Sequence, residues 1–255
     1  MRHPSITEAL AALNVQRPPA TGHPGVLPTL YLTGANPPTD PTEFIGPARD
    51  AAQKLRLMVA HALANGCPPL KLFYGGPSGT GKSALTYYAQ RLFRVSRFAV
   101  YEFNGTDVTI DRVRELRATL GLTHNELFGL YRLICIQEAD RIPDAAQVNM
   151  LTLLDNLPHR TAVICTSNAD LAEMERRFQR RFKFTRIDPP PFDELLSLLR
   201  RWDAPEFVCR MIATGACGNV GLAMNELEEW LQTHPASEPP TPVTPPPQNA
   251  ELALA

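Results

Sequence analysis

Apolar residues recur at two different spacings along residues 42–188, and the two spacings alternate. Segments with apolar residues three to four positions apart predict helices at residues 47–66, 83–93, 112–120 and 145–157. Short, nearly continuous apolar runs predict buried strands at residues 69–75, 98–103, 133–136, 161–167 and 182–187. This alternation predicts an α/β fold in which a five-stranded parallel sheet lies between helices.

The pattern changes after the proline triplet Pro189–Pro191, where only helical spacing remains. It predicts a small all-helical domain over residues 189–233, with helices at 192–202, 205–215 and 219–232. Residues 1–41 are rich in Pro and Gly, with one short helical pattern at 5–13, and predict an irregular arm. Residues 234–255 predict a Pro-rich, disordered tail.

Composition places the 255 residues among soluble globular proteins, with 44% hydrophobic and 20% charged residues. The net charge of −1 gives no general attraction to nucleic acid or to a membrane, so contact with DNA would need a local patch. The five cysteines form no CxxC pair, and no apolar run is long enough to span a membrane. We therefore expect a cytoplasmic protein with reduced thiols and no membrane partner.

The stretch GGPSGTGKSA fits the phosphate-loop pattern G-x-x-x-x-G-K-[ST] and lies between a predicted strand and a predicted helix. In such a loop, glycines let backbone N–H groups turn toward phosphate oxygens, and the following helix adds its positive N-terminal end. The lysine reaches the β- and γ-phosphates, and the serine hydroxyl ligates Mg²⁺. The sequence therefore predicts a nucleoside triphosphate site formed by Gly76, Pro77, Ser78, Gly79, Thr80, Gly81, Lys82, Ser83 and Ala84.

Several further segments, in order, resemble the AAA+ ATPases, and among them the clamp-loader group of replication factor C small subunits and DNA polymerase III accessory subunits. The resemblance covers residues 42–232. The similar segments are residues 43–59, 101–116, 137–157, 163–168, 178–182 and 218–227. It implies a P-loop AAA+ core followed by a helical lid, ATP and Mg²⁺ as cofactors, and other AAA+ subunits as partners.

The resemblance also implies roles for single residues. Glu138, which follows a buried strand, would polarise the attacking water. Asn168 holds the sensor 1 position and would orient that water or the γ-phosphate, although an Asn there could simply end a strand and start a turn. Arg181 would reach the γ-phosphate of a neighbouring subunit. The other basic residues of the run 175–186 could form a solvated face or line a DNA channel.

Three departures weaken the resemblance to a working clamp loader. Gln137 stands where the family has the aspartate that organises Mg²⁺, so we expect it to contribute only a neutral amide oxygen. Asp140, two residues beyond Glu138, is expected to lie too far past the strand to replace it, unless through a water. Gly221 occupies the slot of the sensor 2 arginine. No helical collar domain is expected after the lid.

Three functions fit these observations. The first is an oligomeric AAA+ ATPase whose slow or partner-stimulated ATP hydrolysis remodels a DNA or protein–DNA assembly. The second is a structural subunit that holds ATP at an interface with little hydrolysis, which Gln137 and Gly221 favour. The third is an AAA+ chaperone that remodels another protein.

Overall fold

The computed structural model describes Ser5, Glu8 and residues 38–122, 131–169 and 174–234. Most of the predicted N-terminal arm, including nearly all of the helical pattern at 5–13, lies outside these residues, and so does the predicted tail apart from its first residue. Regular structure begins with a 3-10 turn, η1 (Pro41–Glu43), which the Asp40 side chain caps.

The sheet confirms the sequence-based prediction of five parallel strands. The strands are β1 (Leu70–Gly75), β2 (Val100–Asn104), β3 (Arg132–Gln137), β4 (Thr161–Ser167) and β5 (Lys183–Arg186). They lie in the order β2-β3-β4-β1-β5, and every neighbouring pair is parallel. All their carboxyl ends therefore meet at one edge, where open α/β sheets bind ligands.

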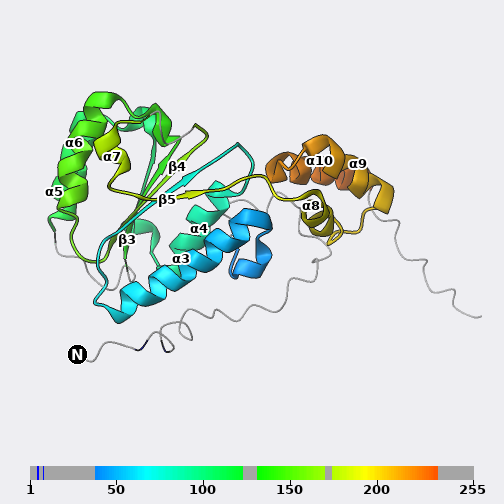
Figure 1. Cartoon of the computed structure of the whole chain (residues 1–255), viewed down its shortest axis with the longest axis horizontal. Coiled ribbons are helices and arrows are strands. Elements are labelled where there is room, and N and C mark those ends of the chain that lie inside the picture. The colour runs from blue at the N-terminus through cyan, green and yellow to red at the C-terminus, as the bar shows by residue number, and fades with distance from the viewer. Residues whose placement is uncertain (1–4, 6–7, 9–37, 123–130, 170–173, 235–255) are drawn as a thin grey trace, which may run out of the picture.

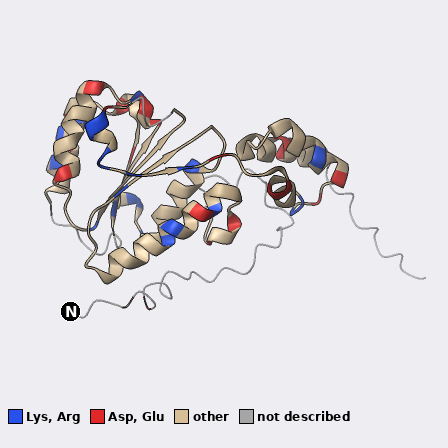
Figure 2. Cartoon of the chain, in the orientation of Figure 1, with Lys and Arg blue, Asp and Glu red and all other residues tan. Residues whose placement is uncertain are grey.

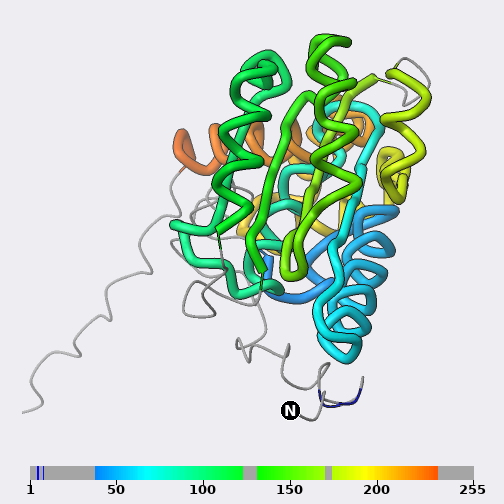
Figure 3. Tube along the Cα trace, turned by 90° about the vertical axis from the view of Figure 1, so that its left-hand side faces the viewer, coloured from blue at the N-terminus to red at the C-terminus, as the bar shows by residue number. Residues whose placement is uncertain are grey.

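Helices cover both faces of the sheet, as Figures 1 and 3 show. Alternate β1 residues face opposite ways: Leu72 and Tyr74 pack on one side and Phe73 on the other. The first layer contains α3 (Gly46–Ala64) and α4 (Lys82–Leu92). The second contains α5 (Ile110–Leu120), α6 (Asp144–Asp155) and α7 (Arg176–Gln179). No described helix is long and apolar enough to cross a membrane.

Two local differences from the predicted elements have simple causes. Residues Arg97–Ala99 form a 3-10 turn, η2, so β2 begins at Val100 rather than at residue 98. The helix α7 interrupts the basic run, because Glu175 caps its first turn through the Phe178 N–H and Phe178 is buried. A single helical turn is too short to show a hydrophobic period.

A separate apolar core joins the three C-terminal helices, α8 (Phe192–Leu199), α9 (Glu206–Ala216) and α10 (Val220–Thr233). Ile45, which precedes α3, packs into this core. The Glu194 carboxylate accepts a hydrogen bond from the Gly46 N–H at 2.8 Å and pairs with Arg49 at 2.6 Å. These contacts attach the three C-terminal helices, called the lid from here on, beside the edge where the strands end (Figure 1).

Candidate functional site

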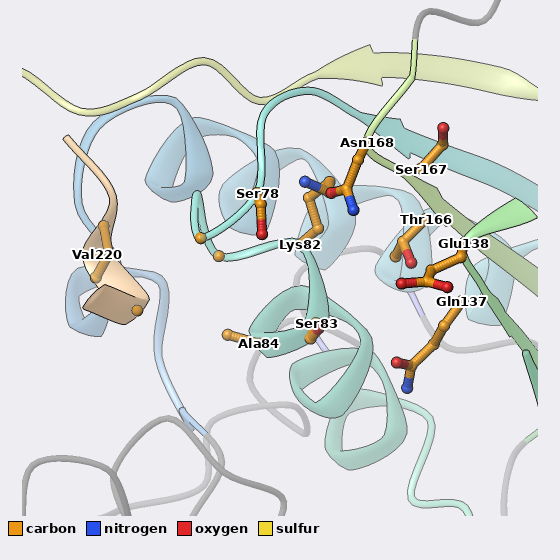
Figure 4. A pocket seen from close by; sticks show the side chains of 13 residues that line it. Ser78, Lys82, Ser83, Ala84, Gln137, Glu138, Thr166, Ser167, Asn168 and Val220 are labelled. Carbon is orange, nitrogen blue, oxygen red and sulfur yellow. The ribbon is translucent and has the colours of Figure 1, made fainter. Parts of the chain in front are cut away.

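A cavity of about 290 Å³ opens at the carboxyl edge of the sheet, between the sheet and the lid. Four segments line it: the phosphate loop with the start of α4, the end of β3, the end of β4, and the start of α10 (Figure 4). Its lining residues are Ser78, Gly79, Gly81, Lys82, Ser83, Ala84, Gln137, Glu138, Thr166, Ser167, Asn168, Val220 and Gly221.

The phosphate loop follows β1 directly and ends at Gly81, the N-cap of α4, as the motif predicts. Gly76, at φ 141°, is required by packing, since a Cβ atom there would lie 2.2 Å from the Ile187 carbonyl oxygen. Thr80 is buried, and its hydroxyl donates to the Pro77 carbonyl at 3.0 Å. Of the nine predicted residues, Gly76, Pro77 and Thr80 therefore shape the loop without lining the cavity.

Lys82 is folded back onto the loop. Its Nζ atom donates to the carbonyl oxygens of Gly76 at 2.7 Å and Pro77 at 2.6 Å, and the residue is only 7% exposed. Burial lowers the pKa of Lys82 to about 8, and the negative charge of Asp140 opposes this shift. The ammonium group is thus held at the loop, where a phosphate oxygen could replace the two carbonyls as its acceptor.

Glu138 follows β3 in a left-handed backbone conformation, with φ 50° and ψ 47°. Its Oε2 atom accepts a hydrogen bond from Asn104 Nδ2 at 3.3 Å and pairs with Arg141 Nη1 at 3.0 Å. Asn104 ends β2 and lies in register with Gln137 on β3. The predicted water-activating carboxylate therefore has two polar partners, to which the sequence-based prediction gave no role at the site.

Oxygen donors stand on two sides of the cavity. Gln137 and Glu138 lie across it from Lys82 and Ser83 (Figure 4). The Ser83 hydroxyl, the Gln137 amide oxygen and the Glu138 carboxylate are ligands of the kind that Mg²⁺ takes, and Mg²⁺ needs few protein ligands when phosphates supply others. Among the described residues, no group of three or more His, Cys, Asp or Glu side chains could hold a metal alone. The donor set therefore fits Mg²⁺ that arrives with a nucleotide.

The end of β4 supplies the remaining side of the site. Asn168 follows β4 and points into the cavity in Figure 4, and its role toward water or phosphate stays a prediction. Thr166 and Ser167 are buried and also line the cavity, although the sequence-based prediction gave them no role. The Ser167 hydroxyl closes the turn by accepting from the Ala169 N–H at 3.0 Å. The run of polar residues Thr166, Ser167 and Asn168 at the end of a predicted strand was the sequence signal that could have identified them.

The lid meets the phosphate loop at the start of α10. The Gly79 carbonyl accepts hydrogen bonds from the N–H groups of Val220 at 2.8 Å and Gly221 at 3.3 Å. Asn219 caps α10 through the Leu222 N–H at 2.9 Å. A Cβ atom on Gly79 would lie 1.8 Å from Asn219 Oδ1. The lid and the loop are therefore in close backbone contact.

Arg181 is the one predicted catalytic residue that the structure does not bring to this cavity. It precedes β5, whose first residue, Lys183, pairs with Leu72 near the opposite end of β1 from the phosphate loop. Its guanidinium binds the Asp155 carboxylate at 3.1 and 2.8 Å, and this pairing lowers the pKa of Asp155. Figure 2 shows α7 and the start of β5 as basic, at the end of the sheet away from the lid. Any contact with a γ-phosphate would therefore be with that of another subunit.

Comparison with known proteins identifies the α/β part of the chain. Residues 72–187 match the family described as ATPase family associated with various cellular activities (AAA). No curated protein sequence matches the chain.

Solved structures of RuvB from Thermotoga maritima share the fold. One of them, described as a Holliday junction branch migration motor, is 17% identical with a TM-score of 0.62 and covers 77% of this chain. Another is 16% identical with a TM-score of 0.63. The chain spans 66% of the length of each of these two structures. Residues 72–187 therefore match an AAA ATPase domain, and the chain has the AAA+ P-loop NTPase fold.

Proposed function

We propose that this AAA-domain protein binds ATP with Mg²⁺ and hydrolyses it slowly or under the control of a partner, as one subunit of a AAA+ assembly. The observation that carries the proposal is the convergence of four segments on one cavity. The phosphate loop, Glu138, Asn168 and the start of the lid come from distant parts of the sequence, yet all of them line it. The family match and the fold support the same conclusion.

The residues have distinct tasks in this account. The loop N–H groups and the α4 N-terminus bind the phosphates, and Lys82 leaves its two carbonyl acceptors to bind a phosphate oxygen. Ser83 and Gln137 hold the metal, which neutralises phosphate charge when bound. Glu138 accepts a proton from the attacking water, and Asn168 orients that water. Gln137 brings no negative charge, so hydrolysis is weakened more than binding.

We propose that the assembly acts on DNA or on a DNA-bound protein. The resemblance to clamp loaders and the fold shared with the RuvB motor support this substrate class. Arg181 supports assembly, because it does not line the cavity of its own chain and belongs to a segment, residues 176–186, that carries six basic residues. A neighbouring copy, or another AAA+ subunit, would bring its γ-phosphate to this arginine.

A second function has specific support. Gln137 lacks the negative charge of the expected aspartate, and Gly221 lacks the positive charge of the expected sensor 2 arginine. The Glu138 carboxylate is already bound by Asn104 and Arg141. These features suit a subunit that holds ATP to fix an interface, with little hydrolysis.

ATP turnover on a sample of defined oligomeric size, with and without DNA, distinguishes the two functions. The first function predicts turnover above that of a Lys82→Ala control, with further stimulation by DNA. The second predicts stable ATP binding, no turnover above the control, and an oligomer whose size changes with nucleotide.

A further inference from the structure

Two separate contacts join the lid to the α/β part of the chain. At the start of α10, the Val220 N–H donates to the carbonyl oxygen of Gly79, in the wall of the nucleotide cavity. In the first turn of α8, the Glu194 Oε2 atom accepts from the Gly46 N–H at 2.8 Å and from Arg49 Nη2 at 2.6 Å. None of the three residues of this second contact lines the cavity, so it holds the lid from outside the nucleotide site.

The backbone turn before α3 is shaped to receive the lid. Ile45 is 6% exposed and packs into the apolar core of the lid. Gly46 has φ 53°, and a Cβ atom there would lie 2.8 Å from Pro190 Cα, so the turn and the segment leading into α8 are in close backbone contact. Arg49 stiffens the turn, because its Nε atom donates to the Phe44 carbonyl at 3.1 Å. The turn is therefore a preformed seat for α8.

A single carboxylate oxygen carries the polar part of this seat. Charge-assisted hydrogen bonds are about twice as strong as neutral ones, although the Arg49 and Glu194 side chains are 38% and 35% exposed and water weakens their attraction. Loss of the carboxylate would leave the Gly46 N–H without its acceptor and Arg49 without this counter-charge. The adjacent Asp193 carries the same charge in the same helical turn but is exposed. The seat thus depends on one particular acidic side chain.

The lid brings no charge of its own into the cavity. Of the residues that the structure describes, the lid contributes Val220 and Gly221 to the cavity wall, and neither can attract a phosphate through a charged side chain. A lid cation bound to the nucleotide therefore cannot hold the lid in place in this chain. The position of the lid over the loop has to be set by contacts outside the cavity, and the Glu194 contact is of that kind.

We propose that Glu194 is a positioning residue that raises nucleotide affinity from outside the cavity. It holds α8 on the turn before α3, and this keeps the start of α10 on the phosphate loop. The apparent affinity for a ligand falls with the fraction of molecules in the binding-competent state, so loosening the lid weakens binding without removing a nucleotide contact. The inference rests on the proposed function of the cavity and adds what holds the lid in its place.

Affinity of the full chain for a non-hydrolysable ATP analogue gives the first test. We expect Glu194→Ala to raise the Kd about 3- to 10-fold, the range for loss of a half-exposed, charge-assisted contact. Glu194→Gln keeps an acceptor for the Gly46 N–H and should lose less affinity than Glu194→Ala. Asp193→Ala removes the same charge one residue away and is the matched control, with a Kd expected within about twofold of the unmodified protein.

Amide hydrogen exchange without nucleotide gives a readout that separates positioning from general stability. Val220 and Gly221 both donate to the Gly79 carbonyl oxygen, so their exchange reports whether α10 rests on the loop. In Glu194→Ala these two amides should exchange at least about threefold faster, while the amides of β3 exchange as before. Asp193→Ala should leave both sets unchanged.

Three results would overturn the inference while leaving the proposed function intact. The first is an unchanged Kd in Glu194→Ala, with Lys82-dependent binding preserved. The second is an equal loss of affinity in Asp193→Ala. The third is faster exchange in β3 as well as in α10, which would assign Glu194 to overall stability. In contrast, nucleotide binding that does not depend on Lys82 in the unmodified protein would contradict the proposed function itself.

Discussion

The carbonyl oxygen of Gly79 and the N–H of Val220 form a hydrogen bond of 2.8 Å, which joins the phosphate loop to the first residue of the last lid helix. Because both atoms belong to the backbone, a shift of the phosphate loop on nucleotide binding would also shift the start of the lid helix α10. It requires that residue 79 have no side chain, since Asn219 occupies the space where a Cβ atom would lie.

Gly79→Ala should therefore separate the lid from the loop. The new methyl group meets Asn219, and the left-handed φ of 74° adds about 1–2 kcal/mol of strain for a residue with a Cβ atom. We expect a lower free energy of unfolding by at least about 1 kcal/mol and ATP binding weakened at least about tenfold, measured by urea unfolding and calorimetry. Gly215→Ala is the control, because nothing lies within 4 Å of a Cβ atom there. Equal effects of the two substitutions would contradict this account of the contact.

The space around Gly221 can take a larger side chain, such as the arginine that the family resemblance expects at this position. A Cβ atom there would lie 3.5 Å from Asn219 Oδ1 and 3.7 Å from Gly79 Cα, which are ordinary contacts, and the residue lines the cavity. Gly221→Arg should tighten ATP binding about 10- to 100-fold relative to Gly221→Ala, because a hydrogen bond to a charged group contributes roughly 1.5–3 kcal/mol. Equal ATP Kd values in the two variants would show that the lid does not face the phosphates.

Arg181 should matter only in the assembled protein. Arg181→Ala is expected to reduce turnover of the oligomer by about 10³-fold or more while the ATP Kd of the monomer is kept. Asp155→Asn breaks the ion pair but leaves the arginine, so it should retain turnover within about threefold. Arg180→Ala removes an exposed neighbouring arginine and serves as the control. A loss shared by Asp155→Asn and Arg181→Ala would assign the pair to stability instead of catalysis.

ATP binding should weaken as the pH rises through about 8, well below the range of an ordinary lysine. The sign follows from the charge: burial favours the neutral amine, and only the ammonium form attracts phosphate. Asp140→Asn should move the midpoint to lower pH, since the Asp140 charge raises the pKa of Lys82. Binding of an ATP analogue in metal-free buffer gives the profile, with exposed Asp144→Asn as the control. A flat profile up to pH 10 would show that Lys82 is not the group that titrates.

The sheet was predictable because each strand is a short apolar run that can be recognised on its own. Leu72, Phe73 and Tyr74 are apolar in succession since both faces of β1 are covered, and the glycine pattern after them marks the loop. The position of the loop followed from its motif, and that of Asn168 from the family resemblance. The position of Glu138 followed from the resemblance and from the rule that ligands bind where parallel strands end.

The polar partners in the site were not predictable in the same way. Asn104 reaches Glu138 only because β2 is the neighbour of β3. The spacing of apolar residues predicts strands but does not predict their order in the sheet. Arg141 reaches it because Glu138 has a left-handed backbone, which no local composition rule requires of a glutamate. The pairing of Arg181 with Asp155 likewise depends on how α6 and α7 pack.

The central claim is that the cavity hydrolyses ATP with a metal contact weakened by Gln137. Turnover of Gln137→Asp, compared with the unmodified protein and with Lys82→Ala, tests it most directly. The account predicts a rise of about 5- to 15-fold in kcat, since a charged oxygen replaces a neutral one at the metal, with no turnover in Lys82→Ala. Turnover in Gln137→Asp that stays at the level of Lys82→Ala would contradict it and leave a site that only holds the nucleotide.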